Sequence, residues 1–464
     1  MNDNNDSKTY DIEAKPKKVK LRDSKLTKTV WLLAWPVIVE MMLLTFVGIV
    51  DMAMVGRLGP SSIAAVGLGT QIVMIATSAF AAIRTGTTAL VARHIGAKDE
   101  DGANVIARQS VTMTIILTVT TFVIFYIFAE GSLKLLGAKP DVVAVGIGYI
   151  RWRSFGLVFS LITMIFTSML RGCGDTKTPM YVNIVINILN PIFNYIFIFG
   201  NFGAPKMGVA GAALGTVLSQ VVGCILIIKV VMKGDKQIKL TLNDDYRLKK
   251  TPVKRILNIG IPAMVEAIFM RFAQIVFTMI LTSIGTATYA AHQIAIRAES
   301  LSFMPGWGFG VAATTLIGQN LGAKEPELAE ESGYVARNMA ILVSSLMGIL
   351  FFIFPVQFVK FFTDDQEVIK QAAKALRLVA IAQPAMAINL VIAGGLRGAG
   401  DTKWVTIITA SSVWLVRLSI AAVGVFYFKL GLIGAWLGMV SDLFIRAIMF
   451  SIRYARGKWK LLKV

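Results

Sequence analysis

The sequence predicts an all-α integral membrane protein, with twelve transmembrane helices in two six-helix lobes. The first observation is composition. The 464 residues are 55% hydrophobic and 16% charged, with a mean hydropathy of +0.67, whereas soluble domains carry about 25% charged residues. The second is that twelve apolar stretches reach the roughly 20 residues that a spanning helix needs. The third is that RGCGDTK, from Arg171, returns 226 residues later as RGAGDTK, from Arg397.

Many other positions follow the same spacing. Pro36 and Glu40 return as Pro262 and Glu266, and beyond the heptapeptide GVAGAALGTV (208–217) matches GLIGAWLGMV (431–440) at a spacing of 223. One alignment with a single gap accounts for all of these matches, which indicates a duplicated unit. Because each unit has an even number of spans, the repeats are parallel, related by a pseudo-two-fold axis along the membrane normal.

Residues 1–29 are polar and rich in Lys, and we interpret them as a cytoplasmic tail. An N-terminal lobe covers 30–233, a Lys-rich linker 234–254, a C-terminal lobe 255–454 and a second tail 455–464. The expected spans are 30–54, 62–92, 104–130, 141–170, 178–200 and 208–233, then 255–284, 288–317, 334–360, 367–395, 404–428 and 431–454.

The distribution of basic residues orients the spans. The formal net charge is +20, and about thirty Lys and Arg fall on the side of the two tails, against about six on the other side. This asymmetry predicts a multi-pass protein of the cell membrane with both termini in the cytoplasm. It also explains the charge without nucleic acid as a partner. Both heptapeptides fall in short loops on the basic side, where their glycines can end one helix and Asp and Thr can begin the next.

Two carboxylates stand in the first expected span. Glu40 and Asp51 are eleven residues apart, so they share one helical face at a separation of about 16 Å along the axis. An ionisable group inside a membrane costs about 2.5–3.5 kcal/mol on insertion scales, and it is a functional-site hypothesis by default.

Four asparagines form a stripe in the fifth span. Asn183, Asn187, Asn190 and Asn194 are spaced 4, 3 and 4 apart, which places them on one face. One interpretation is hydrogen bonding between helices. The other is a cation site, because amide and carboxylate oxygens are the hard ligands that Na⁺ or a hydronium requires.

The repeat tests which polar residues are specific to one lobe. Asp51 corresponds to Phe277, and neither spacing gives an asparagine opposite any member of the stripe. We therefore expect ion coupling in the N-terminal lobe. Glu40 and Glu266 correspond to each other, which favours a symmetric or structural role, with Arg84 and Arg271 as candidate partners. Glu40, Glu266, Met270 and Arg84 are also our candidates for a substrate cavity.

Several classes of function are excluded or disfavoured. The sequence has no GxxxxGK[ST] loop that would bind a nucleotide. No Cys and His cluster with metal-ligand spacing and no catalytic constellation is visible, so we expect neither an enzyme, nor a cofactor, nor a resident metal beyond transient Na⁺ at Asp51, Asn190 and Asn194. We expect a monomer.

The sequence resembles the multidrug and toxic compound extrusion family, within the multidrug/oligosaccharidyl-lipid/polysaccharide flippase superfamily. The resemblance covers nearly all of the chain after residue 28 and rests on segments such as GIVDMAMVGRLG (48–59), MLRGCGDTKTPMYVNI (169–184) and NPIFNYIFIFG (190–200). It implies a cation-coupled antiporter, driven by H⁺ or Na⁺, that exports amphipathic and often cationic drugs.

The resemblance also implies roles for individual residues. The family's first-span aspartate falls on Asp51, its fifth-span polar pair on Asn190 and Asn194, and its sixth-span threonine on Thr216; we add Asn187 from the stripe. Arg84 departs from the family, whose members often have a small residue there. The alternative functions are a lipid-linked oligosaccharide flippase of the same superfamily, and a channel or non-transporting receptor.

Overall fold

The computed structural model describes residues 24–464, apart from 235–236, 242 and 463. Most of the expected N-terminal tail therefore lies outside the described residues. The helices of the first half are α1 (Ser24–Gly56), α2 (Pro60–Gly96), α3 (Glu100–Ile127), α4 (Ala129–Leu135), α5 (Pro140–Gly172), α6 (Lys177–Phe199), the short η1 (Asn201–Gly203) and α7 (Val209–Lys233).

The second half repeats this order. Its helices are α8 (Lys250–Thr282), α9 (Thr286–Gly322), α10 (Pro326–Ile353), α11 (Pro355–Lys360), α12 (Gln366–Gly398), α13 (Thr402–Ser411), the π-helical η2 (Ser412–Arg417), α14 (Leu418–Ala422), the π-helical η3 (Val423–Tyr427), α15 (Gly431–Ala455) and the short η4 (Lys458–Leu461).

The expected spans are confirmed as helices, with shifted ends. The first begins at Ser24 rather than residue 30, and the third and ninth each break near their ends, at Phe128 and at Phe354. Pro355 explains the second break, because proline at the first helical position has no N–H to continue the preceding helix. In the described chain eleven helices are long and apolar enough to cross a membrane; α9, which carries His292, Arg297 and Glu299, is the twelfth long helical segment.

The duplication extends to backbone conformation. Gly174 and Gly400, the second glycines of the two heptapeptides, both have φ of 86°. Lys98 and Lys324, which end the matching GAK segments, have φ of 57° and 62°. A positive φ is costly for lysine, so its recurrence at matched positions shows that the two halves turn the chain in the same way.

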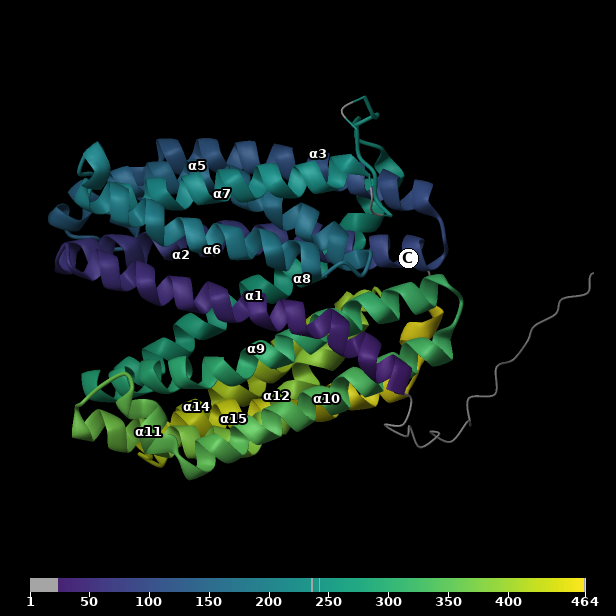
Figure 1. Cartoon of the computed structure of the whole chain (residues 1–464). Coiled ribbons are helices and arrows are strands. Elements are labelled where there is room, and N and C mark those ends of the chain that lie inside the picture. The colour runs from purple at the N-terminus through teal and green to yellow at the C-terminus, as the bar shows by residue number, and fades with distance from the viewer. Residues whose placement is uncertain (1–23, 235–236, 242, 463) are drawn as a thin grey trace, which may run out of the picture.

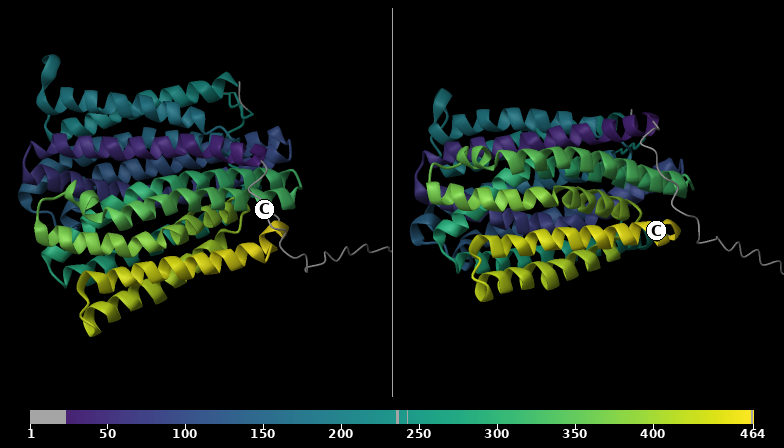
Figure 2. Two further views of the ribbon diagram at one scale, coloured as in Figure 1. Left: turned by 60° about the horizontal axis from the view of Figure 1, so that its bottom comes forward. Right: turned by 90° about the horizontal axis from the view of Figure 1, so that it is seen from below.

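The helices form two lobes that lean together at one end. In Figure 1 the lobe of α2–α7 lies above the lobe of α9–α15, and the two meet at the right, where the C-terminus lies. Figure 2 shows the long helices running along a common direction in both further views. We call the end with the heptapeptide loops and the C-terminus the basic end.

The first helix of each half crosses between the lobes. The N-terminal part of α1, including Val30 and Ala34, packs against Phe309 of α9 and Val335 of α10. Its C-terminal part packs the other way, with Val55 against α6 and α7, and Figure 1 shows this diagonal path. In α8, likewise, Ile256 and Ile259 pack in the core of the first lobe, while Ala273 and Phe277 pack in that of the second.

The basic end is tightly closed. Thr315 Oγ1 of α9 donates to the carbonyl oxygen of Arg171 (2.8 Å), and Gln319 Nε2 donates to that of Gly172 (2.9 Å). A Cβ added at Gly96 would overlap the Gln319 carbonyl oxygen, and one added at Gly322 would overlap that of Arg93. The two repeat-related glycines therefore allow α2 and α9 to touch backbone to backbone.

The linker and the C-terminal segment are packed rather than extended. Ile238 and Leu240 are buried in the first lobe, and Arg108 Nη1 of α3 donates to Asp244 Oδ1 (3.1 Å). After α15, Trp459 is fully buried and stacks on Tyr454 with ring centroids 4.8 Å apart.

Candidate functional site

Asp51 lies in a polar cluster that α1, α6 and α7 form inside the first lobe. Asn194 Nδ2 donates to Asp51 Oδ1 (2.7 Å). Asn194 and Asn190 lie one turn apart on α6, with 3.2 Å between their amides, and Asn190 lies 3.2 Å from Thr216 Oγ1 of α7. Both asparagines are almost completely buried, with exposed fractions of 3% for Asn190 and 1% for Asn194. The structure thus brings Asp51, Asn190, Asn194 and Thr216 together.

The Asn190 amide can serve the Asp51 carboxyl group in two orientations. One of its terminal atoms lies 2.7 Å from Asp51 Oδ1, and the other lies 3.2 Å from Thr216 Oγ1. With its nitrogen toward Asp51, the amide donates to a carboxylate and accepts from Thr216. With its oxygen toward Asp51, it needs a proton or a cation between the two oxygens, because two acceptors cannot hydrogen-bond each other.

The remaining two asparagines of the stripe are elsewhere. Asn183 Nδ2 donates to Glu40 Oε1 (3.0 Å). Asn187 is buried, and its Nδ2 has no hydrogen-bond partner within the described chain. The structure therefore places Asn187 between two clusters, with no hydrogen bond from that amide nitrogen to Asp51.

Glu40 and Glu266 each form an ion pair with the arginine of a heptapeptide. Arg171 Nη2 lies 2.7 Å from Glu40 Oε2, and Arg397 Nη2 lies 2.8 Å from Glu266 Oε1 and 2.9 Å from Oε2. The expected partners, Arg84 and Arg271, were wrong. Arg271 is exposed, and the last turns of α5 and α12 carry Arg171 and Arg397 to the glutamates instead.

Both glycine-rich loops end one helix and are followed by the start of the next, as expected, but their aspartates act differently. After Gly174, Asp175 Oδ1 accepts from the backbone N–H of Thr178, and its Oδ2 accepts from the Thr178 hydroxyl (2.7 Å). In the second loop the aspartate has a different use, because Arg453 Nε donates to Asp401 Oδ2 (2.7 Å). The heptapeptide therefore forms the loop between two helices and also supplies an arginine that reaches into the lobe.

A cavity of about 250 Å³, here called the central cavity, lies between the lobes beside the last turns of α5 and α12. Three of the expected cavity residues line it, Arg84, Glu266 and Met270, while Glu40 lies behind Arg171. The complete lining is Ala81, Arg84, Thr85, Thr88, Ser168, Arg171, Ala263, Glu266, Ala267, Met270, Trp307, Gly310, Val311, Thr314, Leu390, Gly394 and Arg397.

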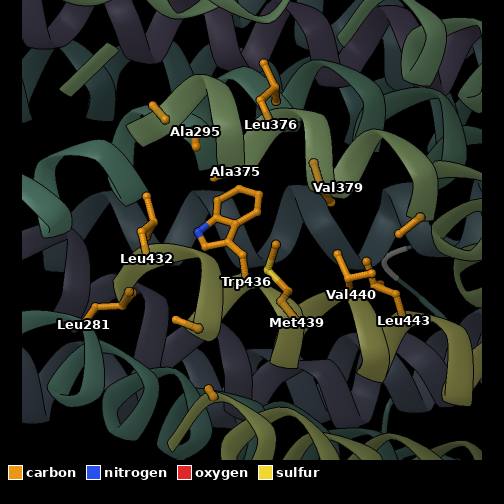
Figure 3. Packing of buried hydrophobic residues seen from close by; sticks show 14 of the residues in the cluster. Leu281, Ala295, Ala375, Leu376, Val379, Leu432, Trp436, Met439, Val440 and Leu443 are labelled. Carbon is orange, nitrogen blue, oxygen red and sulfur yellow. The ribbon is translucent and has the colours of Figure 1, made fainter. Parts of the chain in front are cut away.

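The second lobe has an apolar core where the first has the Asp51 cluster. Phe277, which corresponds to Asp51, is 2% exposed, and Met439, which corresponds to Thr216, packs with it and with Trp436. Figure 3 shows Trp436 and Met439 within this core. Trp436 Nε1 donates to His292 Nδ1 (3.2 Å), so His292 is a satisfied core residue.

One buried charge cluster escaped the sequence reasoning. Asp442 of α15 is fully buried and accepts from Arg417 Nη2 (2.6 Å), Arg446 Nη2 (2.7 Å) and Ser412 Oγ (2.6 Å). The i, i+4 spacing of Asp442 and Arg446 within an apolar span was the available signal. The cluster anchors α15 to the π-helical segment η2.

Comparison with known proteins identifies what this architecture is similar to. The MatE family model matches residues 36–196 and again residues 262–423. The probable multidrug resistance protein NorM of Thermotoga maritima is 34% identical over 442 residues, which cover 92% of each chain. The uncharacterized transporter YisQ of Bacillus subtilis is 27% identical over 93% of this chain and 95% of its own.

Solved structures agree with the sequence comparison. An outward-facing multidrug resistance MATE family transporter has a TM-score of 0.87 and 27% identity, over 96% of this chain and all of that one. A transporter of the MOP superfamily from Pyrococcus furiosus also has a TM-score of 0.87, with 26% identity over the same shares.

Proposed function

The chain belongs to the MatE family of membrane transporters, and from this premise we propose that it is a multidrug efflux antiporter coupled to the entry of H⁺ or Na⁺. The observation that carries the coupling is the cluster of Asp51, Asn190, Asn194 and Thr216, which the duplicated lobe lacks. A site needed only for packing would be expected in both lobes. Asp51 is thus the proposed coupling carboxylate.

The proposed chemistry follows from the two orientations of the Asn190 amide. When Asp51 is a carboxylate, Asn194 donates to it and Asn190 can donate a second hydrogen bond. When Asp51 takes a proton, it can donate to the Asn190 oxygen instead. Na⁺ would use the oxygens of Asp51, Asn190 and Thr216, which are hard ligands. Either ion removes the net negative charge of the cluster, and that change biases the lobes between their two arrangements.

The closed basic end supports an alternating-access cycle. With the basic side in the cytoplasm, as the basic loops indicate, this arrangement faces outward, in line with the outward-facing relative. Opening toward the cytoplasm then requires breaking the contacts of Thr315 and Gln319 with α5. We propose a monomer in the cell membrane that moves amphipathic compounds through the central cavity.

The decisive experiment is efflux of a fluorescent amphipathic compound from vesicles, tested once as a cation and once as a zwitterion, with H⁺ and Na⁺ gradients imposed separately. The wild type should respond to one of the two gradients. Asp51→Asn should abolish that response while the protein keeps its melting temperature in detergent. Asp245→Asn, which removes an exposed carboxylate of the linker, is the matched control. Gradient-driven efflux that survives Asp51→Asn would refute the coupling role.

A further inference from the structure

The charges that line the central cavity do not balance. Arg84, Arg171 and Arg397 line it, together with Glu266. Arg171 is paired with Glu40, and Arg397 with Glu266. Two of the three arginines are therefore neutralised by direct ion pairs, and Arg84 is left as an uncompensated positive charge.

Arg84 has no side-chain hydrogen bond or ion pair within the described chain, although it lines a cavity between packed helices. Arg171 and Arg397, which line the same cavity, supply no counter-charge for it. A charge removed from water is costly unless a partner satisfies it. Arg84 is therefore positioned to bind an anionic group of a molecule that enters the cavity.

The duplication shows that this arginine is not required to pack the helices. Its repeat mate is Gly310, where an added Cβ would lie 2.9 Å from the carbonyl oxygen of Leu390. The neighbouring threonines Thr88 and Thr314 are repeat mates and use their hydroxyls alike, each on a carbonyl of its own helix and one of the facing helix. The framework around the cavity is thus symmetric, and Arg84 is an addition to one half of it.

The rest of the wall is largely apolar. Met270, Trp307, Val311 and Leu390 line the cavity beside Arg84. Methionine and tryptophan suit apolar bodies of varied shape, and a guanidinium matches a planar oxyanion through two parallel hydrogen bonds. The lining therefore offers one cationic contact, the Arg84 guanidinium, and an apolar surface.

We propose that Arg84 binds a single oxyanion, a carboxylate or a phosphodiester, at one end of an amphipathic substrate whose apolar part lies against Met270 and Trp307. This assignment rests on the transport function proposed above and names the substrate class: amphipathic monoanions and zwitterions. Neither Glu40 nor Glu266 is free to attract a cation, because each is paired with its arginine.

The test is binding of 1-naphthylacetate to the full-length protein in maltoside detergent, which carries no oxyanion, measured by calorimetry against the detergent alone. Its neutral analogue 2-(1-naphthyl)ethanol has the same apolar part. The wild type should bind the carboxylate about tenfold more tightly or better, as expected for a charge-assisted hydrogen bond. Arg84→Met should abolish this preference, and Arg84→Lys should keep part of it.

The matched control is Arg271→Met, which removes an exposed arginine of α8 outside the cavity lining and should leave the preference intact. Equal binding of the two probes by the wild type, or a preference that survives Arg84→Met, would overturn the proposal. If Arg84→Met does not fold, the wild type alone can test the proposal. A naphthylmethyl trimethylammonium probe is then added to the comparison, and tighter binding of this cation than of the carboxylate would contradict an oxyanion site.

A second arm identifies the source of the oxyanion. Phosphatidylglycerol added to the detergent should lower the apparent affinity for 1-naphthylacetate if a lipid headgroup occupies Arg84, and should leave it unchanged if free compounds do. The outcome is separable from that of the transport test. If the wild type shows no carboxylate preference but its efflux depends on Asp51, the oxyanion site alone is rejected. If the carboxylate preference is present but efflux does not depend on Asp51, the coupling role alone is rejected.

Discussion

Arg171 and Glu40 form a buried ion pair, with 2.7 Å between Nη2 and Oε2, which recurs 226 residues later as Arg397 and Glu266. Each pair joins the last turn of one helix to the middle of the first helix of the same half. Glu40 and Glu266 are buried, and the arginines reach them from the cavity wall. Each pair therefore holds α1 to α5, or α8 to α12, where water screens the charges less than at an open surface.

Removing one member of this ion pair should destabilise the protein more than removing both members. Glu40→Gln or Arg171→Met alone leaves one buried charge uncompensated, which costs about 3–5 kcal/mol. The double variant should recover part of that loss, because no charge is then left unpaired. The measurement is the melting temperature in detergent across the four proteins. Glu130→Gln, which removes the exposed pair with Lys134, should change nothing. Additive losses in the double variant would contradict the coupling.

Thr216 should set the affinity of the coupling site through the Asn190 amide. Thr216→Val removes the hydroxyl that lies 3.2 Å from that amide, a hydrogen bond of about 1 kcal/mol. The ion concentration needed for half-maximal efflux should therefore rise about fivefold. Ser219→Ala removes a hydroxyl that bonds only to its own helix, and it should leave the ion dependence unchanged. An unaltered ion dependence in Thr216→Val would remove Thr216 from the site.

Gly96 should control closure of the basic end. Gly96→Val places a side chain where the Gln319 carbonyl oxygen lies, so α2 and α9 must separate. With the native cysteines replaced by alanine, Thr85→Cys in the cavity wall should react with an impermeant thiol reagent from the basic side faster in the Gly96→Val protein than in the protein with Gly96. Gly67→Val on the same helix is the control, since a Cβ there meets nothing within 4 Å. An unchanged rate in Gly96→Val, or the same rise in the Gly67→Val control, would contradict a role of this contact in closure.

The attachment of the linker to α3 should depend on pH. The backbone N–H of Thr241, and then Arg108, hold the pKa of Asp244 below its ordinary value of 3.8. A lowered pKa means that the charged form is the one the fold stabilises, so the contribution is complete above pH 3.8 and is lost as pH falls below it. Pepsin should cleave the linker faster at pH 3 than at pH 4.5. Asp244→Asn should show the fast cleavage already at pH 4.5. Equal cleavage of variant and wild type at that pH would exclude Asp244 as the contact.

The fold could be predicted from the sequence because its determinants are local or periodic. Span length and the 226-residue spacing need no knowledge of which helices touch. Identifying the partner of Glu40 requires knowing which helices touch. Arg171 was interpreted as a marker of the cytoplasmic side, since nothing in a heptapeptide reveals that its first residue points back into the lobe. The equal separation of Glu40 from Arg171 and of Glu266 from Arg397 was the signal. It becomes meaningful once α1 is known to pack beside α6, with the last turn of α5 within reach of Glu40.

The candidate site, too, could be predicted from the sequence only in part. Helical spacing put Asn190 and Asn194 on one face of the fifth span, the resemblance grouped them with Asp51, and the structure brings the three together. Helical spacing also put Asn183 and Asn187 on that face, but α1 passes α6 with Asn183 beside Glu40. Helical spacing gives the direction in which a side chain points. The crossing of two helices decides which residues along that face contact the neighbouring helix.

The crossed paths of α1 and α8 have a consequence for assembly. Val30 and Ala34 pack in an apolar core with helices of the opposite half, and so do Ile256 and Ile259. A polypeptide of one repeat length would therefore expose an apolar strip on its first helix and leave a vacant groove to receive one. Two such polypeptides could satisfy each other only by exchanging those helices. The covalent chain accordingly behaves as an obligate dimer of its own halves, and the two halves expressed separately should be stable only when produced together.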